Sequence, residues 1–108
     1  MTKVELVKSG IHYSLSIKGH AGYADEGKDI VCSACSILAY SVLQEIENLD
    51  KRGMLEITEF HMGESKILIG FDLYVDTAII ALDTVMEGYR WLAENYPKNI
   101  CIQYPKGE

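Results

Sequence analysis

The chain has 108 residues, of which 48% are hydrophobic and 24% are charged, so its size and composition are those of a single globular domain. Its formal net charge of −6 argues against direct binding to nucleic acid, because phosphates repel an acidic protein. No apolar run reaches the length of a membrane span and the N-terminus lacks the apolar segment of a signal peptide, so we expect a cytoplasmic protein without membrane contact.

The start of the chain predicts a β-hairpin. Polar and apolar side chains alternate along residues 2–9 and, more regularly, along residues 11–18, as they do in half-buried strands. Ser9 and Gly10 are typical turn residues, so we expect the two strands to be antiparallel. The side chains expected to face the core from the second strand are Ile11, Tyr13, Leu15 and Ile17.

A long helix is predicted after a polar loop. Residues 20–28 form the loop, in which Gly22 and Gly27 favour flexibility. Asp29 is placed to cap the helix, because its carboxylate can accept hydrogen bonds from the first-turn N–H groups, and the helix is expected to end near Leu49. Its apolar stripe comprises Val31, Cys35, Leu38, Val42, Ile46 and Leu49, widened by Ile30, Ala34 and Ile37.

The second half of the chain predicts two more strands and a second helix. The strands cover residues 54–62 and 66–72, with turn residues between them. The helix is expected to be capped by Asp76 or Thr77 and to end at Asn95, because a proline follows shortly afterwards. Its apolar stripe comprises Ala78, Leu82, Val85, Tyr89, Leu92 and Tyr96.

A last strand from Asn99 to Tyr104 completes the order ββαββαβ. This order is typical of an α+β two-layer sandwich, in which two helices cover one face of a mainly antiparallel five-stranded sheet. No stretch has the composition of a linker, so we expect residues 1–108 to form one domain.

Cys32 and His20 are the candidate reactive residues. With Asp29 as the cap, Cys32 is the third residue of the helix, where backbone N–H groups and the helix dipole favour a thiolate. His20 follows a strand and could take the thiol proton. The alternative interpretation is that Cys32 is a small core side chain and His20 a surface residue, and spacing alone does not decide between the two.

Cys32 and Cys35 also form a CxxC pair, which suggests redox or metal chemistry. A thioredoxin-like CxxC follows a strand directly, whereas this pair follows a long loop, and Cys35 falls on the predicted buried stripe. A structural zinc site needs four ligands, and only His20, Cys32 and Cys35 cluster in the sequence, so we expect no metal or other cofactor. Without a secretion signal, the three cysteines are expected to be free thiols.

These residues resemble the bacterial ribosomal-processing cysteine protease (Prp) family. The resemblance rests on Gly19-His20-Ala21, the glycine-bearing loop, Asp29-Ile30-Val31-Cys32-Ser33-Ala34 and Ser36, and it extends to chain length and element order. It implies a homodimeric endopeptidase that removes a short N-terminal extension from the precursor of large-subunit ribosomal protein twenty-seven. An acidic protein would suit such a basic partner.

The resemblance also implies roles for individual residues. Cys32 matches the nucleophile and His20 the general base, while Gly19, Asp29 and Ser36 match supporting positions. Asp29 could orient His20, cap the helix, or do both, and N–H groups of the first turn could stabilise an oxyanion. The loop residues expected to close over substrate are Ala21, Gly22, Tyr23 and Gly27.

Two alternatives to the protease remain at this point. One is a noncatalytic ribosome-associated binding module with Cys32 buried, and the other is a thiol redox protein that uses Cys32 and Cys35. Cys35 departs from the family, where a small aliphatic residue is usual. For the dimer, the apolar residues Met86, Tyr89 and Trp91 on the second helix suggest an exposed patch suited to self-association.

Overall fold

The computed structural model describes residues 1–25 and 29–103, and it confirms the predicted α+β class. The strands lie in the order β3-β4-β2-β1-β5, in which only β5 runs parallel to its neighbour, β1. Tyr104, the expected end of the last strand, and Gly27 of the loop lie outside the described residues. The elements are β1 (Thr2–Ser9), β2 (His12–Lys18), α1 (Ile30–Lys51), β3 (Leu55–Gly63), β4 (Lys66–Leu73), the 3₁₀ turn η1 (Asp76–Ala78), α2 (Ile79–Asn95) and β5 (Ile100–Gln103).

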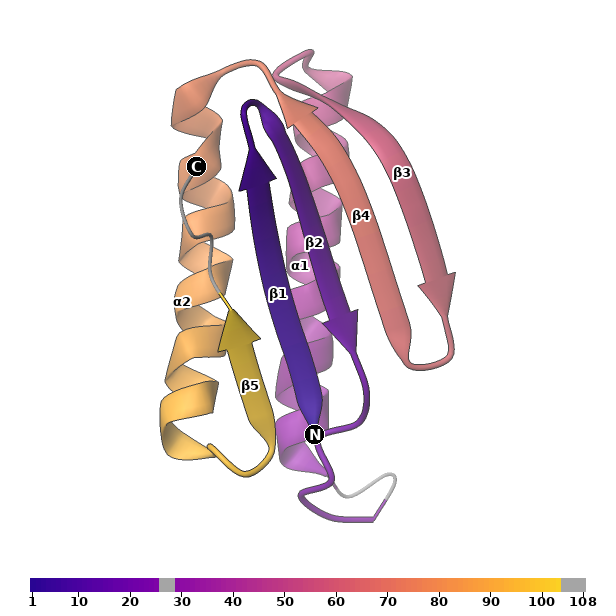
Figure 1. Ribbon diagram of the computed structural model, residues 1–108, viewed down its shortest axis with the longest axis vertical. Coiled ribbons are helices and arrows are strands. Elements are labelled where there is room, and N and C mark those ends of the chain that lie inside the picture. Colours follow the sequence, from indigo (N-terminus) through magenta and orange to yellow (C-terminus); the bar gives the residue numbers. More distant parts are fainter. Residues whose placement is uncertain (26–28, 104–108) are drawn as a thin grey trace.

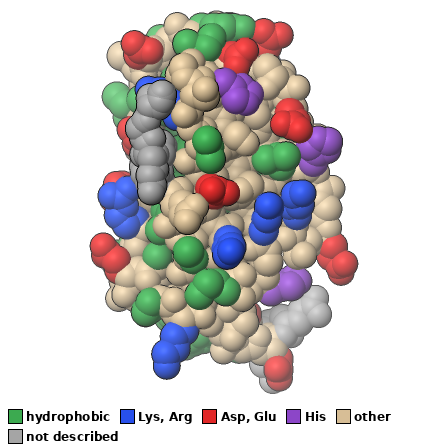
Figure 2. Space-filling view, in the orientation of Figure 1, with side chains coloured by type: hydrophobic (Ala, Val, Ile, Leu, Met, Phe, Trp, Pro, Cys, Tyr) green, Lys and Arg blue, Asp and Glu red, His purple; other side chains and the backbone are tan. Residues whose placement is uncertain are grey.

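The two helices cover one face of the sheet and leave the other open, as predicted (Figure 1). The open face is mostly polar, and basic side chains gather across its middle strands (Figure 2). Lys3, Lys18 and Lys66 stand in register there on β1, β2 and β4. A polar open face is what an antiparallel sheet needs when only one of its sides is packed.

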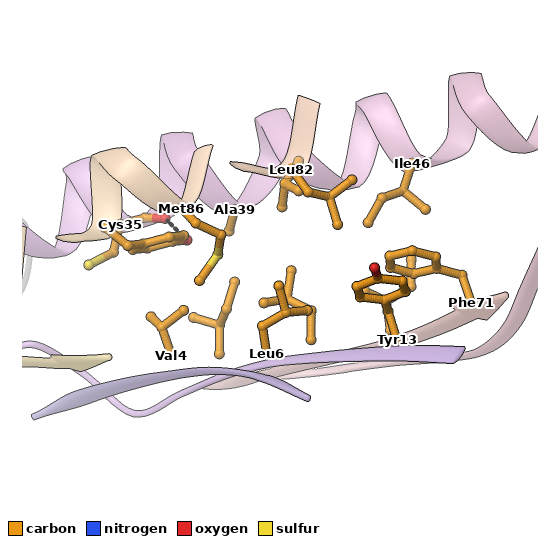
Figure 3. Close-up of a cluster of buried hydrophobic side chains, with 14 of the residues drawn as sticks. Val4, Leu6, Tyr13, Cys35, Ala39, Ile46, Phe71, Leu82 and Met86 are labelled. Carbon is orange, nitrogen blue, oxygen red and sulfur yellow. Dashed lines mark hydrogen bonds between the residues drawn. The ribbon is translucent and has the colours of Figure 1, made fainter. Parts of the chain in front are cut away.

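The core lies between the sheet and the helices. Alternate strand residues such as Val4 and Leu6 point toward the helices and are almost fully buried (Figure 3). Tyr13 and Phe71 stack with their ring centroids 5.4 Å apart. Tyr89, which is fully buried, donates a hydrogen bond from its hydroxyl to the carbonyl oxygen of Cys35 at 2.9 Å, so it joins α2 to the first half of α1.

The predicted inward position of Ile11 is wrong. Ser9 pairs with His12, so Gly10 and Ile11 form a two-residue turn, and Ile11 is 55% exposed. Gly10 adopts a φ of 63°, which is the backbone conformation that tight hairpin turns require. The alternation of apolar residues therefore extended one residue beyond the strand itself.

The predicted stripe of α1 is correct at most positions and wrong at two. Ile30 and Ile37 are 60% and 64% exposed, because the buried row follows the sheet and leaves both on the outer side. Leu38 is half-buried and packs against Gly88 of α2, where an added Cβ would lie 2.9 Å from Leu38 Cδ2. The residues of α1 that are buried are Val31, Cys35, Ala39, Val42, Ile46 and Leu49.

The predicted start of the second helix is also wrong. Asp76 and Thr77 lie in the 3₁₀ turn η1, and α2 begins after Ala78 without a side-chain cap hydrogen bond. The buried row of α2 includes Met86 in place of the expected Val85, which is half-buried.

The expected dimer patch on α2 is largely absent. Met86 and Tyr89 are 1% and 0% exposed and belong to the core, whereas Trp91 is 58% exposed. The three residues therefore do not form one exposed apolar surface, and Trp91 alone remains of that prediction.

The length of α1 corrects the expectation that no apolar run is long enough to span a membrane. Its 22 residues are, by length and composition alone, enough to cross a membrane. The core helix of a soluble protein passes the same test, and α1 packs a row of buried side chains against the sheet. Its composition is therefore only weak support for a membrane span.

Candidate active site

A cleft lies where β2 ends and α1 begins. It consists of two adjoining cavities of about 660 and 170 Å³. The side chains that line both cavities are His20, Cys32, Ser36, Tyr40 and Glu64. The fold therefore brings the predicted nucleophile and general base to one concave site, although each comes from a different element.

Cys32 occupies the third position of α1 and is half-buried. Its sulfur therefore lies near the N-terminal end of a 22-residue helix, where the helix dipole favours negative charge. Exposure to both cavities distinguishes Cys32 from a core thiol. The alternative interpretation, in which Cys32 is a buried and unreactive core residue, does not fit this position.

His20 is exposed and lies just beyond the end of β2, and Gly19 fixes the backbone that leads to it. Gly19 has a φ of 89°, and its N–H donates to the carbonyl oxygen of Ser65 at 2.8 Å. A Cβ on this residue would lie only 2.5 Å from the carbonyl oxygen of Met1. The position therefore requires glycine for both its backbone angle and its close approach to β1.

Asp29 caps α1, as predicted, and also binds the loop. Its Oδ1 accepts the N–H of Cys32 at 2.8 Å, and its Oδ2 accepts those of Tyr23 and Ala24 at 2.9 and 3.4 Å. Burial raises the pKa of this carboxyl, but the backbone hydrogen bonds outweigh that effect and hold the pKa below its usual value. Within the described part of the chain it makes no hydrogen bond to His20.

The predicted substrate loop divides into anchors and lining residues. Ala21 is 1% exposed, and its carbonyl oxygen accepts a hydrogen bond from Asn99 Nδ2 at 2.9 Å. Tyr23 meets Tyr96 edge to face, with ring centroids 5.5 Å apart. Gly22 lines the larger cavity, whereas Ala21 and Tyr23 do not, so these two residues hold the loop to the domain.

Ser36 lines both cavities, and so does Tyr40, a candidate pocket residue that the sequence alone did not place in the site. Cys32, Ser36 and Tyr40 follow one another at intervals of four along α1, so they share a helix face. This spacing in the sequence could therefore have placed Tyr40 beside Cys32 and Ser36. Glu64 was also missed, and it reaches the cleft only because the turn between β3 and β4 folds back beside Gly19.

An apolar groove continues from the cleft between α1 and β3. Its volume is about 390 Å³, and Tyr40 lines both it and the cleft. Leu43 and Phe60 form part of its walls, and Phe60 is 50% exposed. The cleft is therefore open along one side to a surface that suits an extended chain with apolar side chains.

Cys35 is buried, as predicted, and it lines only the smaller of the two cavities. Burial, together with the nearby Cys32 and Asp29, raises the pKa of its thiol to about 11, against the opposing effect of a hydrogen bond with the Thr2 side chain. At neutral pH Cys35 is thus a protonated thiol. No group of three or more His, Cys, Asp or Glu residues in the described ranges could hold a metal ion.

Known proteins resemble this chain in both sequence and fold. Residues 1–101 match the family described as cysteine protease Prp. The ribosomal processing cysteine protease Prp of Mycoplasma genitalium is 34% identical over 88 residues, which cover 82% of this chain and 84% of that protein.

Solved structures support the fold. The essential ribosomal processing protease Prp from S. aureus, in complex with a covalently linked product peptide, has a TM-score of 0.69 at 20% identity, covering 96% of this chain and 99% of that one. A Streptococcus mutans protein has a TM-score of 0.66 at 22% identity, covering 98% and 96%. Together with the match over residues 1–101, the relative from Mycoplasma places this chain in the cysteine protease Prp family, and the chain is a cysteine protease.

Proposed function

We propose that the protein removes the N-terminal extension of large-subunit ribosomal protein twenty-seven, with Cys32 as nucleophile and His20 as general base. The observation that carries the assignment of residues is that both side chains line the same cleft, one at a helix start and the other beside a strand end. The relatives described as ribosomal processing proteases support a ribosomal protein as substrate. The net charge of −6 favours a basic substrate.

The reaction follows from these positions. Cys32 Sγ attacks the carbonyl carbon of the scissile peptide bond, and His20 takes the thiol proton and delivers it to the leaving amine. Water then attacks the thioester, with His20 again as base, and releases the N-terminal fragment and the free thiol. Half-burial of Cys32 leaves its sulfur open to an incoming peptide.

Two of the N–H groups near the start of α1, where oxyanion donors were expected, already have hydrogen-bond partners. The N–H of Cys32 is bound to the Asp29 carboxylate, and the N–H of Ser33 to the Asp29 carbonyl oxygen. Ser36 lines both cavities one helical turn beyond Cys32, and its side chain makes no hydrogen bond with another described residue. We assign Ser36 as a donor to the oxyanion or to the substrate backbone.

Cleavage of the extended precursor tests the proposal. Wild type, Cys32→Ala, His20→Ala and, as a matched control, Cys101→Ala would each be mixed with the precursor and followed by intact mass. Wild type and Cys101→Ala should release one defined N-terminal fragment, and the other two should not. A precursor that binds but stays intact with every variant would favour the noncatalytic ribosome-associated module.

Dimerisation and location are further parts of the proposal. A homodimer is consistent with the exposed apolar side chains Ile80 and Trp91 on the outer side of α2. Sedimentation of wild type and Trp91→Glu would test it, because loss of the dimer in the variant would place the contact on α2. A single monomeric species in both would contradict it. A cytoplasmic location agrees with a ribosomal protein as substrate.

A further inference from the structure

Cys35 is the reactive group that the proposed mechanism leaves unused. It lies three residues after Cys32 on α1, and both residues line the smaller cavity together with His20. Cys32 also opens to the larger cavity, whereas Cys35 is only 5% exposed. One thiol can therefore be reached from solvent, and the second lies behind it.

The helix holds the two residues at a distance that permits a disulfide. Residues three apart in an α-helix have Cα atoms about 5 Å apart, given the helix rise and radius. Disulfides span Cα distances of about 4.4–6.8 Å. The Cβ atoms are about 5–6 Å apart in a regular helix and must approach to about 4 Å, so the first turn has to tighten.

The first turn of α1 is the part of the helix where such a change is easiest. A 3₁₀ turn brings side chains at i and i+3 into line, and short 3₁₀ segments are common at helix N-termini. Cys32 lies in this turn, where the Asp29 carboxylate accepts its N–H. Tightening at Cys32 leaves the buried row from Ala39 onward in place.

We propose that Cys32 and Cys35 form a reversible redox modification site in which Cys35 is the resolving cysteine. A peroxide oxidises the Cys32 thiolate to a sulfenic acid, and the second peroxide oxygen leaves as hydroxide or water. The Cys35 sulfur then attacks the Cys32 sulfur, the S–O bond breaks, and the hydroxyl leaves as water with the Cys35 proton. A dithiol reductant restores both thiols and is itself oxidised to a disulfide.

His20 can move the proton that this step requires. Cys35 is protonated at neutral pH, so its attack on sulfur must release a proton. His20 lines the same cavity as both thiols and is exposed to solvent, so it can pass the proton to water. The disulfide occupies the sulfur that carries out peptide hydrolysis and protects it from irreversible oxidation. The site is therefore a reversible off state.

Mass mapping after peroxide treatment tests this inference without any protease assay. Wild type, Cys35→Ala and Cys101→Ala would be treated with hydrogen peroxide, unfolded in urea so that every free thiol is accessible, and then alkylated, and the peptides would be mapped before and after a dithiol reductant. Cys101 is a suitable control because it lies on β5 in register with Lys3, on the open face of the sheet. Cys35→Val is a second variant in case alanine weakens the fold.

Wild type and Cys101→Ala should lose the alkylation of Cys32 and Cys35 together, with the loss of two hydrogens in mass, and reductant should restore both. Cys35→Ala and Cys35→Val should instead add two or three oxygens to Cys32, as sulfinic or sulfonic acid, and the reductant should restore little of the thiol. An oxidised Cys32 beside a fully alkylatable Cys35 in wild type would overturn the inference. Because the readout is chemical, failure to cleave the ribosomal precursor would not affect it.

Discussion

The two helices of this protein each follow a β-hairpin but begin in different ways. At the start of α1, the Asp29 carboxylate accepts the N–H groups of Cys32, Tyr23 and Ala24 and so joins the helix to the loop. At the start of α2, a 3₁₀ turn leads into the helix without a side-chain cap. Among the described residues, the cleft and its thiol lie at the capped start, so Asp29 helps to build the site as well as to begin the helix.

The largest expected effect is the loss of precursor cleavage when the site at the start of α1 is changed. Replacement of Cys32 by alanine should reduce precursor cleavage by about 10⁴-fold or more, because the nucleophile is removed. Replacement of His20 by alanine should reduce it by about 10²–10⁴-fold. Both variants should unfold within about 1 kcal/mol of wild type in urea, since neither side chain is fully buried. A large loss of stability would mean that the inactivity is structural.

The next largest effect is expected at Gly19, which leads into the site. Gly19→Ala places a Cβ 2.5 Å from the Met1 carbonyl oxygen at a φ of 89°, so unfolding free energy should fall by about 2 kcal/mol or more. Gly22→Ala is the matched control, because its φ is 71° but nothing lies within 4 Å of an added Cβ. Its loss should be only about 1 kcal/mol. Equal losses in urea denaturation would show that the contact with Met1 is unimportant.

Alanine at Asp29 and at Asp76 compares the two helix starts directly. Asp29→Ala should cost about 1–2 kcal/mol of unfolding free energy, since it removes a cap, whereas Asp76→Ala should change it by less than about 0.5 kcal/mol. Similar losses in the two variants would contradict the difference between the caps.

The stability difference between wild type and Asp29→Ala should depend on pH. The native pKa of Asp29 is lowered, so the carboxylate contributes stability above its unfolded pKa of about 4. That contribution should disappear as the pH falls through the lower native pKa. Urea denaturation across this range should therefore show wild type and Asp29→Ala converging in acid, and a gap that persists in acid would contradict the assignment.

A modest effect is expected at Tyr89, which does not line the cleft and joins α2 to α1. Tyr89→Phe removes the buried hydrogen bond to the Cys35 carbonyl oxygen and should lower the unfolding free energy by about 1 kcal/mol. Precursor cleavage should stay close to that of wild type. Thermal denaturation measures the loss, and a large fall in cleavage would mean that α2 positions Cys32.

The features that sequence predicted well are those set by neighbouring residues. Alternation located the strands, and Asp29 was recognisable as a cap because capping acts over one helical turn. Local pattern was less reliable for burial. Ile37 and Val85 fit the apolar period of their helices, yet the direction in which each helix meets the sheet left Ile37 exposed and Val85 half-buried.

The parts of the site that sequence did not predict depend on distant segments. Glu64 reaches the cleft because the turn after β3 bonds to Gly19, and no local signal records that contact. Ala21 and Tyr23 were expected to face substrate, but Asn99 and Tyr96 from the other end of the chain hold them. Such pairings are decided by the whole fold.

The rate of alkylation at each cysteine shows whether Cys32 is a reactive thiol activated by His20. Wild type and His20→Ala would be treated with iodoacetamide at neutral pH, and modification at Cys32, Cys35 and Cys101 followed by peptide mass. We predict fast reaction at Cys32, almost none at buried Cys35, and slower reaction at Cys32 when His20 is absent. Slow reaction at Cys32 in wild type, or a rate unchanged by loss of His20, would mean that Cys32 is not a nucleophile activated by His20.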